Sequence, residues 1–134
     1  MDNKIIIALG SNWEQEKNIH FAMQRLRSFF PAICFSRLVW TQPIGIKSDR
    51  FLNGLGMADL SVMPNSGMGK ADEVVLVLKQ IERECGRKSE DKAHGVVRVD
   101  LDLLQFQSQR FHEDDWDRDY VRLLLQETFF EKLR

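Results

Sequence analysis

The sequence is poor in the residues that mark several protein classes. It contains only two cysteines, Cys34 and Cys85, and neither has Cys-x-x-Cys spacing or a cysteine-histidine pattern typical of zinc ligands. We therefore expect free thiols in a reducing compartment and neither a disulfide framework nor a zinc site. The chain also lacks an excess of charge of either sign, because 19 lysines and arginines nearly balance 20 aspartates and glutamates. No long-range field would attract nucleic acid or an anionic membrane, and neither is an expected partner.

Long apolar runs are missing as well. The first apolar segment covers only residues 5–9, which is too short for the core of a signal peptide or for a membrane span. We therefore expect a cytoplasmic protein. A chain of 134 residues with 43% hydrophobic content has the size of one ordinary domain, so we expect residues 1–134 to form a single domain. A monomer is the favoured oligomeric state.

Apolar periodicity predicts strands and helices in alternation. Predicted strands cover residues 5–9, 33–41, 51–62, 98–106 and 110–112, and predicted helices cover residues 14–30 and 71–85 and part of 116–133. Pro31 should end the first helix, and Gly86 suits the C-cap of the second. The order β-α-β-β-α-β indicates an α+β, ferredoxin-like fold with an antiparallel sheet, helices on one face and a short C-terminal extension. The other face would be open to a ligand.

Two aspartates interrupt the apolar strand at residues 98–106. Because side chains alternate along a strand, Asp100 and Asp102 share one face, roughly 6.6 Å apart along the chain. Two converging carboxylates could hold Mg²⁺. They could equally be solvated on an open sheet face or paired with Arg98, since Asp-x-Asp on a strand is a weak motif. The spacing leaves these alternatives open.

Five short motifs follow one another along residues 4–106. They are residues 8–12 (ALGSN), 41–45 (TQPIG), 51–53 (FLN), 81–87 (IERECGR) and 99–103 (VDLDL). Each is short, but together and in this order they are fairly specific. The chain thereby resembles the 6-hydroxymethyl-7,8-dihydropterin pyrophosphokinase family, transferases of folate biosynthesis that move pyrophosphate from ATP to a pterin alcohol.

The resemblance implies roles for individual residues. Asp100 and Asp102 would hold two Mg²⁺ ions between ATP and the pterin hydroxyl, and Arg87 would be the third catalytic residue. Catalysis would then consist mainly of positioning and electrostatic stabilisation. The implied pterin-binding residues are Thr41, Pro43, Ile44, Gly45, Phe51 and Asn53. The implied nucleotide-binding residues are Lys79, Glu82, Arg87, Arg98 and Leu103.

The chain departs from the family pattern in two places. Val97 stands where the resemblance implies a phosphate-binding arginine, and Arg98 follows one position later, on the aspartate face, where it could pair with the aspartates. The acidic residues 114–119 replace a segment with Pro-His and a further arginine. Two functions therefore stay open: a Mg²⁺-dependent pyrophosphokinase with slow turnover, or a non-catalytic descendant that binds pterin or nucleotide.

The aromatic residues of the C-terminal segment have two possible roles. Phe111, Trp116 or Tyr120 could stack on a ligand ring, although core packing is the commoner role for such side chains. A nucleic-acid-binding module of the same topology is disfavoured, because the chain has no RNA-binding aromatic strand motif and no basic surface.

Overall fold

The computed structural model describes residues 3–43, 45, 48–62 and 69–127. Its elements are β1 (Lys4–Ser11), α1 (Gln15–Phe29), β2 (Cys34–Phe35), β3 (Val39–Thr41), β4 (Phe51–Asp59), α2 (Ala71–Glu84), β5 (Asp100–Phe106), β6 (Gln109–Arg110) and α3 (Asp119–Leu125). Short 3₁₀ turns occur at Leu60–Val62 (η1), Lys92–His94 (η2) and Glu113–Asp117 (η3). None of the helices in these ranges is long and apolar enough to cross a membrane.

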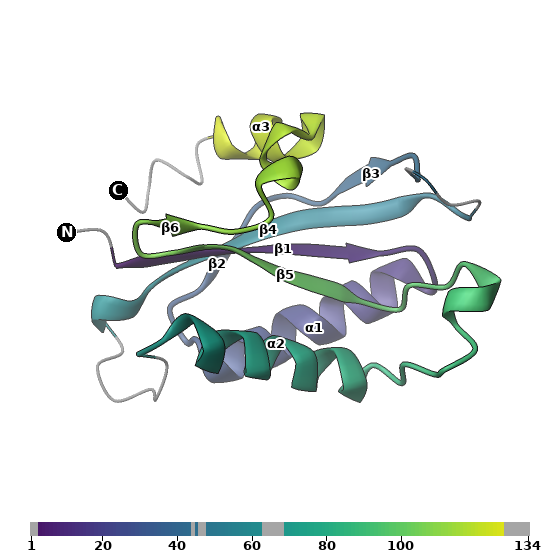
Figure 1. The fold of residues 1–134 in the computed structure, drawn as a ribbon, viewed down its shortest axis with the longest axis horizontal. Helices are drawn as coiled ribbons and strands as arrows, with labels where there is room; N and C mark the ends of the chain where they lie inside the picture. Colours follow the sequence, from purple (N-terminus) through teal and green to yellow (C-terminus); the bar gives the residue numbers. More distant parts are fainter. Residues whose placement is uncertain (1–2, 44, 46–47, 63–68, 128–134) are drawn as a thin grey trace.

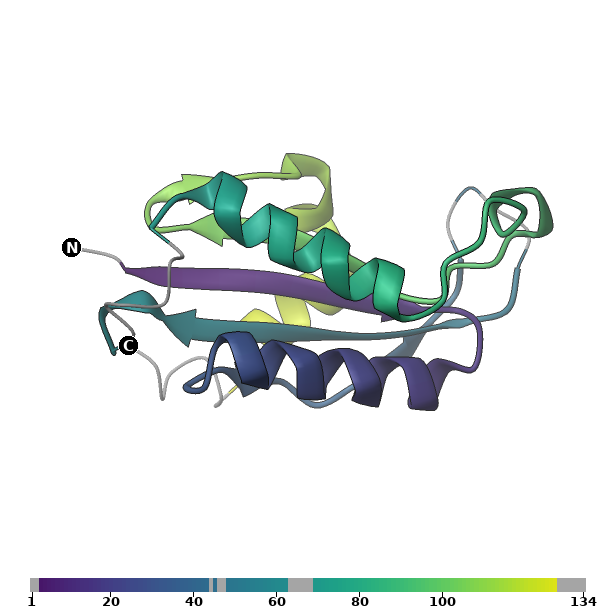
Figure 2. The same ribbon diagram turned by 90° about the horizontal axis from the view of Figure 1, so that it is seen from below.

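The strands form one antiparallel sheet, in the order β2-β4-β1-β5-β6, with β3 also paired to β4 (Figure 1). Helices α1 and α2 lie side by side on one face, which we call the helix face (Figure 2). This arrangement confirms the predicted α+β architecture. Helix α3 and η3 lie over the opposite face, which we call the second face (Figure 1). The face that we expected to be open is therefore covered in part by the C-terminal extension.

Strand β1 is buried on both faces, as its nearly continuous apolar sequence predicts. On the helix face, Ile5 and Ile7 join a core that includes Leu26 of α1 and Leu78 of α2. A smaller core lies on the second face, where α3 packs on the sheet. Its buried members are Ile6, Ala8, Leu55, Met57, Leu104, Val121 and Leu124. Burial of its apolar side chains therefore holds α3 against the sheet.

The helix ends agree with their sequence signals. Helix α1 ends at Phe29, two residues before Pro31. Gly86 follows α2 with φ +89°, a left-handed conformation that favours glycine at this C-terminal position.

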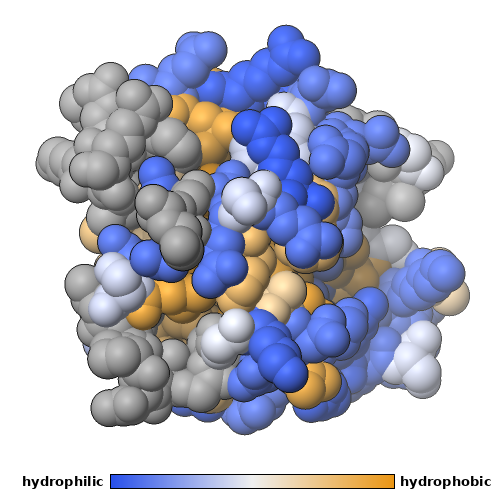
Figure 3. Space-filling model, turned by 60° about the vertical axis from the view of Figure 1, so that its left-hand side comes forward, coloured by the Kyte–Doolittle hydropathy of each residue, from blue (hydrophilic) through white to orange (hydrophobic). Residues whose placement is uncertain are grey.

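Most polar side chains lie outside, and a view of the end at which β1 begins is largely hydrophilic, with apolar side chains showing in the middle (Figure 3).

Three predicted strands differ most from the structure, and β1 and β6 also differ from their predicted ranges by one or two residues at each end. The strand expected at residues 33–41 is split into β2 and β3, because the Ser36 hydroxyl accepts a hydrogen bond from the backbone N–H of Leu55 (2.9 Å) in place of a backbone acceptor. Strand β4 ends at Asp59 and continues as a 3₁₀ turn. The aspartate strand begins at Asp100, two residues later than expected.

Candidate functional site

A row of three paired residues lies across the second face. Gly10 of β1 pairs with Asn53 of β4 on one side and with Asp100 of β5 on the other. A Cβ atom at Gly10 would lie 3.0 Å from Asn53 Oδ1, so a side chain there would crowd the amide. In the neighbouring row, Ala8 pairs with Asp102. Small residues in the C-terminal half of β1 therefore leave room for the Phe51 ring, which would lie 3.7 Å from a Cβ atom at Gly10.

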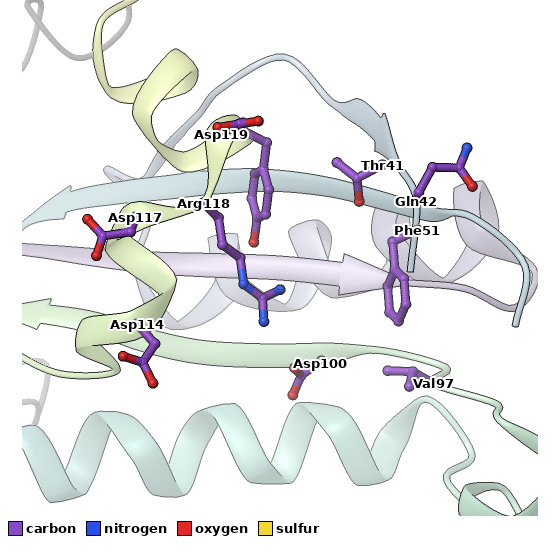
Figure 4. Close-up of a pocket in the computed structure, with 10 residues that line it drawn as sticks. Thr41, Gln42, Phe51, Val97, Asp100, Asp114, Asp117, Arg118 and Asp119 are labelled. Carbon is purple, nitrogen blue, oxygen red and sulfur yellow. The ribbon is translucent and has the colours of Figure 1, made fainter. Parts of the chain in front are cut away.

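A cavity of about 810 Å³, which we call the sheet-face cavity, lies at the Asp100 end of this row (Figure 4). It is lined by Thr41, Gln42, Phe51, Val97, Asp100, Asp114, Asp117, Arg118, Asp119 and Tyr120. Its walls come from β3 and β4, from the start of β5, and from η3 and the start of α3. The volume lies within the range of about 300–1,000 Å³ usual for small-molecule sites.

A second cavity of about 530 Å³, which we call the loop cavity, lies against the loop between α2 and β5. It is lined by Arg87, Lys88, Ser89, Asp91, Lys92, Val96, Val97, Arg98, Val99 and Asp100. Val97 and Asp100 line both cavities, so the two meet at these residues. The sheet-face cavity has four aspartates and one arginine, whereas the loop cavity has four cationic side chains and two aspartates. The two cavities therefore differ in the sign of their charge.

The residues implied for pterin binding are only partly gathered. Thr41 and Phe51 line the sheet-face cavity. Asn53 is buried beside them, and its amide donates a hydrogen bond to the Thr41 hydroxyl. Pro43 and Gly45 lie in the loop after β3, outside the lining of the two cavities. Ile44 lies outside the described residues.

Asp100 and Asp102 project from the second face, as the alternation predicts. The Asp102 side chain is 30% exposed, and its Oδ1 atom lies 3.9 Å from His112 Nε2. Burial, together with the charge of Asp100, raises the pKa of Asp102 to about 7. Two carboxylates with this mutual repulsion favour a cation between them. In the part of the chain that the structure describes, no group of three or more histidine, cysteine or acidic side chains could hold a metal ion by itself.

Arg98 does not pair with the aspartates of β5, so that expectation was wrong. Its Nε atom donates to Asp91 Oδ2 (2.9 Å), and its guanidinium lies 4.2 Å from the centre of the Trp13 ring. Strand alternation fails here because residues 97–99 precede β5, which begins only at Asp100. The backbone N–H of Val97 donates a hydrogen bond to the Asn12 side chain (2.6 Å) in place of a neighbouring strand.

The other implied nucleotide-binding residues lie in different environments. Glu82 is buried, and its carboxylate accepts hydrogen bonds from the Leu101 backbone N–H (2.8 Å) and from Arg87 (3.4 Å). Burial raises the pKa of Glu82. Arg87 lines the loop cavity. Lys79 is exposed on α2 outside both linings, and Leu103 is 3% exposed in the helix-face core. We therefore leave Lys79 and Leu103 out of the proposed site.

The C-terminal segment brings Arg118 and Tyr120 to the lining of the sheet-face cavity, and only Tyr120 was among the possible stacking rings named from the sequence. Arg118, held by an ion pair with Asp115 (3.1 Å), extends from the segment before α3 toward the strand that carries Asp100 (Figure 4). Tyr120 also lines the sheet-face cavity, and burial raises its pKa to about 12. Buried Val121 and Leu124 pack α3 on the sheet and so place these two side chains at the cavity.

Nearly the whole chain matches one known protein family. Residues 6–129 match the model of a family described as 7,8-dihydro-6-hydroxymethylpterin-pyrophosphokinase. The match includes η3 and α3, which follow the five motifs, so the C-terminal segment lies within the family match even though its sequence departs from the expected pattern.

Two proteins of Arabidopsis thaliana are similar in sequence. One, a folate synthesis bifunctional protein, is 28% identical over 129 residues, which cover 88% of this chain and 25% of the relative. The other, a mitochondrial folate synthesis bifunctional protein, is 30% identical over 133 residues, covering 90% of this chain and 22% of the relative. The chain thus spans about a quarter of the length of these relatives.

Proposed function

Because this chain belongs to the 7,8-dihydro-6-hydroxymethylpterin-pyrophosphokinase family, we propose that it transfers pyrophosphate from ATP to 6-hydroxymethyl-7,8-dihydropterin in folate biosynthesis. The hydroxymethyl oxygen forms a bond to the β-phosphorus, and the bond from that phosphorus to the oxygen bridging it to the α-phosphorus breaks. AMP and the hydroxyl proton leave. The observation that supports the proposal best is the meeting of two oppositely charged cavities at Asp100.

The sheet-face cavity suits a neutral, flat acceptor ring. Phe51 and Tyr120 bring aromatic side chains to its lining, and Thr41 brings a hydroxyl that is already fixed by the Asn53 amide. Aromatic side chains stack on planar heterocycles, and fixed polar groups set the orientation of a ring. An acceptor held in this cavity would lie beside the carboxylate of Asp100, which lines it.

The loop cavity suits the triphosphate. Arg87, Lys88 and Lys92 surround it, and cationic hydrogen-bond donors bind phosphate oxygens more strongly than neutral donors do. Arg118 extends toward Asp100 from the opposite side (Figure 4). A phosphate chain that runs from the loop cavity to Asp100 would therefore have cations at both ends.

Asp100 and Asp102 fit the role of Mg²⁺ ligands. Their shared face and the raised pKa of Asp102 show two carboxylates that repel each other, and a divalent cation would remove that repulsion. Mg²⁺ in phosphate-transfer sites is usually held by one or two carboxylates, with water and substrate phosphates completing the shell. When bound there, it would neutralise phosphate charge and align the attacking oxygen.

The experiment is an assay of AMP release from ATP with the pterin alcohol and Mg²⁺. We expect Asp100→Asn and Asp102→Asn to lower the rate roughly 10²-fold or more, because each removes a charge that holds the metal. Asp72→Asn, at an exposed position on α2 outside both cavities, is the matched control and should keep the wild-type rate. Absence of AMP release from the wild-type protein would contradict the proposal.

One observation favours a second function. Val97 stands where the two cavities meet, so an apolar side chain occupies the position at which the family resemblance implies an arginine. This favours a non-catalytic descendant that binds pterin or nucleotide. Direct pterin binding measured alongside AMP release separates the two functions, since the descendant would bind the pterin without releasing AMP.

A further inference from the structure

Arg98 touches three separate segments of the chain. Its Nε and Nη2 atoms lie 2.9 Å and 3.5 Å from the two carboxylate oxygens of Asp91, within the loop between α2 and β5. The Trp13 ring, just after β1, covers one side of the guanidinium at 4.2 Å. The Nη1 atom would lie 3.5 Å from a Cβ atom at Gly86, so the side chain reaches the end of α2. With side chains 14% and 10% exposed, Arg98 and Asp91 form an ion pair largely shielded from water.

The same loop is held by further hydrogen bonds. The Asp91 carboxylate accepts the backbone N–H of Lys88 (2.9 Å), and its backbone carbonyl accepts that of Val96 (2.8 Å). The Asn12 side chain, at the end of β1, donates to the Gly95 carbonyl (2.8 Å). The loop is therefore closed on itself around the Arg98–Asp91 pair, and its C-terminal part is tied to the end of β1 through Asn12.

We propose that Arg98 is a positioning residue that holds the loop in its binding shape before a ligand arrives, so that Arg87, Lys88 and Lys92 stand assembled around the loop cavity. The inference rests on the proposed function, in which this cavity takes a triphosphate. Asp91 already engages two nitrogen atoms of the Arg98 guanidinium. Arg98 would therefore affect ligand binding by holding the loop in position. A preassembled loop removes most of the ordering penalty from ligand binding.

The first test compares the affinities for the two ligands. Arg98→Met should weaken binding of a non-hydrolysable ATP analogue with Mg²⁺ by roughly 10- to 100-fold, because the cations lose their positions. Binding of the pterin alcohol should not change. Arg98→Lys should restore part of the affinity, since an ammonium can bond Asp91 and lie over Trp13. Arg83→Met removes the same charge from an exposed position on α2 and should change neither affinity.

Trp13→Leu provides a second variant if Arg98→Met fails to fold, because Trp13 is 36% exposed. It removes the stacking surface and leaves the Asp91 ion pair in place, so it should weaken nucleotide binding in the same direction and to a smaller extent. Circular dichroism checks that each variant is folded. Equal weakening of pterin and nucleotide binding in folded variants would mean a general structural role and would overturn the inference.

The second test measures whether the loop is assembled without ligand. The chain has three tryptophans, so Trp40→Phe with Trp116→Phe leaves Trp13 as the sole tryptophan. Acrylamide quenching of its fluorescence should stay the same when tripolyphosphate and Mg²⁺ are added, and should increase when Arg98→Met is introduced. A severalfold fall in quenching on adding tripolyphosphate would show that the loop closes only on binding, which would overturn the inference.

Failure of the inference and failure of the proposed function are distinguishable. A folded Arg98→Met variant with wild-type nucleotide affinity would overturn the inference and leave pyrophosphate transfer in place. A wild-type protein that binds nucleotide in an Arg98-dependent manner but releases no AMP would overturn pyrophosphate transfer alone.

Discussion

The buried carboxylate of Glu82 accepts a hydrogen bond from the backbone N–H of Leu101, the residue between the two aspartates of β5 (2.8 Å). The same carboxylate also accepts a hydrogen bond from Arg87 of the loop cavity (3.4 Å). A single side chain of α2 therefore contacts both the aspartate strand and a cation of the proposed phosphate site. Its position on the helix face allows it to do so without entering either cavity.

Glu82→Ala should lower the free energy of unfolding by about 1.5–3 kcal/mol, because it leaves the Leu101 N–H without its charged acceptor. Glu82→Gln keeps an acceptor oxygen for that N–H and should lower the free energy of unfolding less. Urea denaturation measures both values. Leu76→Ala, at a position of α2 that is 68% exposed, is the control and should stay within about 0.5 kcal/mol of wild type. Equal stability of Glu82→Ala and wild type would contradict this account.

The contribution of Asp102 to the stability of the metal-free protein should fall as pH rises from about 4 to about 7. The pKa of Asp102 is raised from 3.8 to about 7 in the fold, so in this window the folded state binds more protons than the unfolded state and loses stability as they leave. Asp102→Asn should weaken this dependence. Urea denaturation across the pH range measures it, and Mg²⁺ at pH 8 should stabilise wild type more than Asp102→Asn. The stability of wild type relative to Asp102→Asn should fall through this window, and a difference that stays constant would refute the assignment.

Tyr120→Leu should weaken binding of the pterin alcohol roughly tenfold, because stacking of an aromatic side chain on a base contributes about 1–3 kcal/mol. Tyr120→Phe keeps the ring and should bind the pterin nearly as wild type does. Affinity for the ATP analogue should be the same in both variants, since Tyr120 lines only the sheet-face cavity. Calorimetry measures the affinities. Identical pterin affinity in Tyr120→Leu and Tyr120→Phe would exclude stacking on this ring.

Val97→Arg should increase the rate of AMP release by about 10- to 100-fold, because a cationic hydrogen bond to phosphate contributes about 1.5–3 kcal/mol. Val97 lines both cavities, so an arginine there has access to a phosphate chain that passes between them. Val97→Met adds length without charge and serves as the control. Pterin affinity should be similar in all three proteins, and a rate unaffected by the new arginine would contradict the proposed path of the phosphate chain.

The elements that could be predicted from the sequence are those set by local patterns. The apolar run at residues 5–9 became the doubly buried strand β1, and the apolar spacing of residues 14–30 and 71–85 became α1 and α2. Pro31 and Gly86 marked helix ends because their effects on the backbone are local. The shared face of Asp100 and Asp102 followed from alternation within one strand.

The prediction for Arg98 failed because the same alternation was extended beyond the strand. The side chain of Asn12 bonds the backbone of Val97, 85 residues away along the chain, and β5 begins only at Asp100. The sequence of residues 94–100 by itself does not indicate that contact. The partner of Arg98 was therefore decided by the packing of the loop against Trp13 and Asp91.

By itself, the sequence determined the α+β element order, the pair of carboxylates on one strand and the family resemblance, because hydrophobic period and short motifs are local properties. Only the tertiary structure decided that α3 covers part of the second face and that Arg118 and Tyr120 reach the sheet-face cavity. Residues 114–119 are acidic and give no such signal. Their position depends on burial of Val121 and Leu124 against strands far away in the sequence, a long-range hydrophobic contact that local patterns cannot encode.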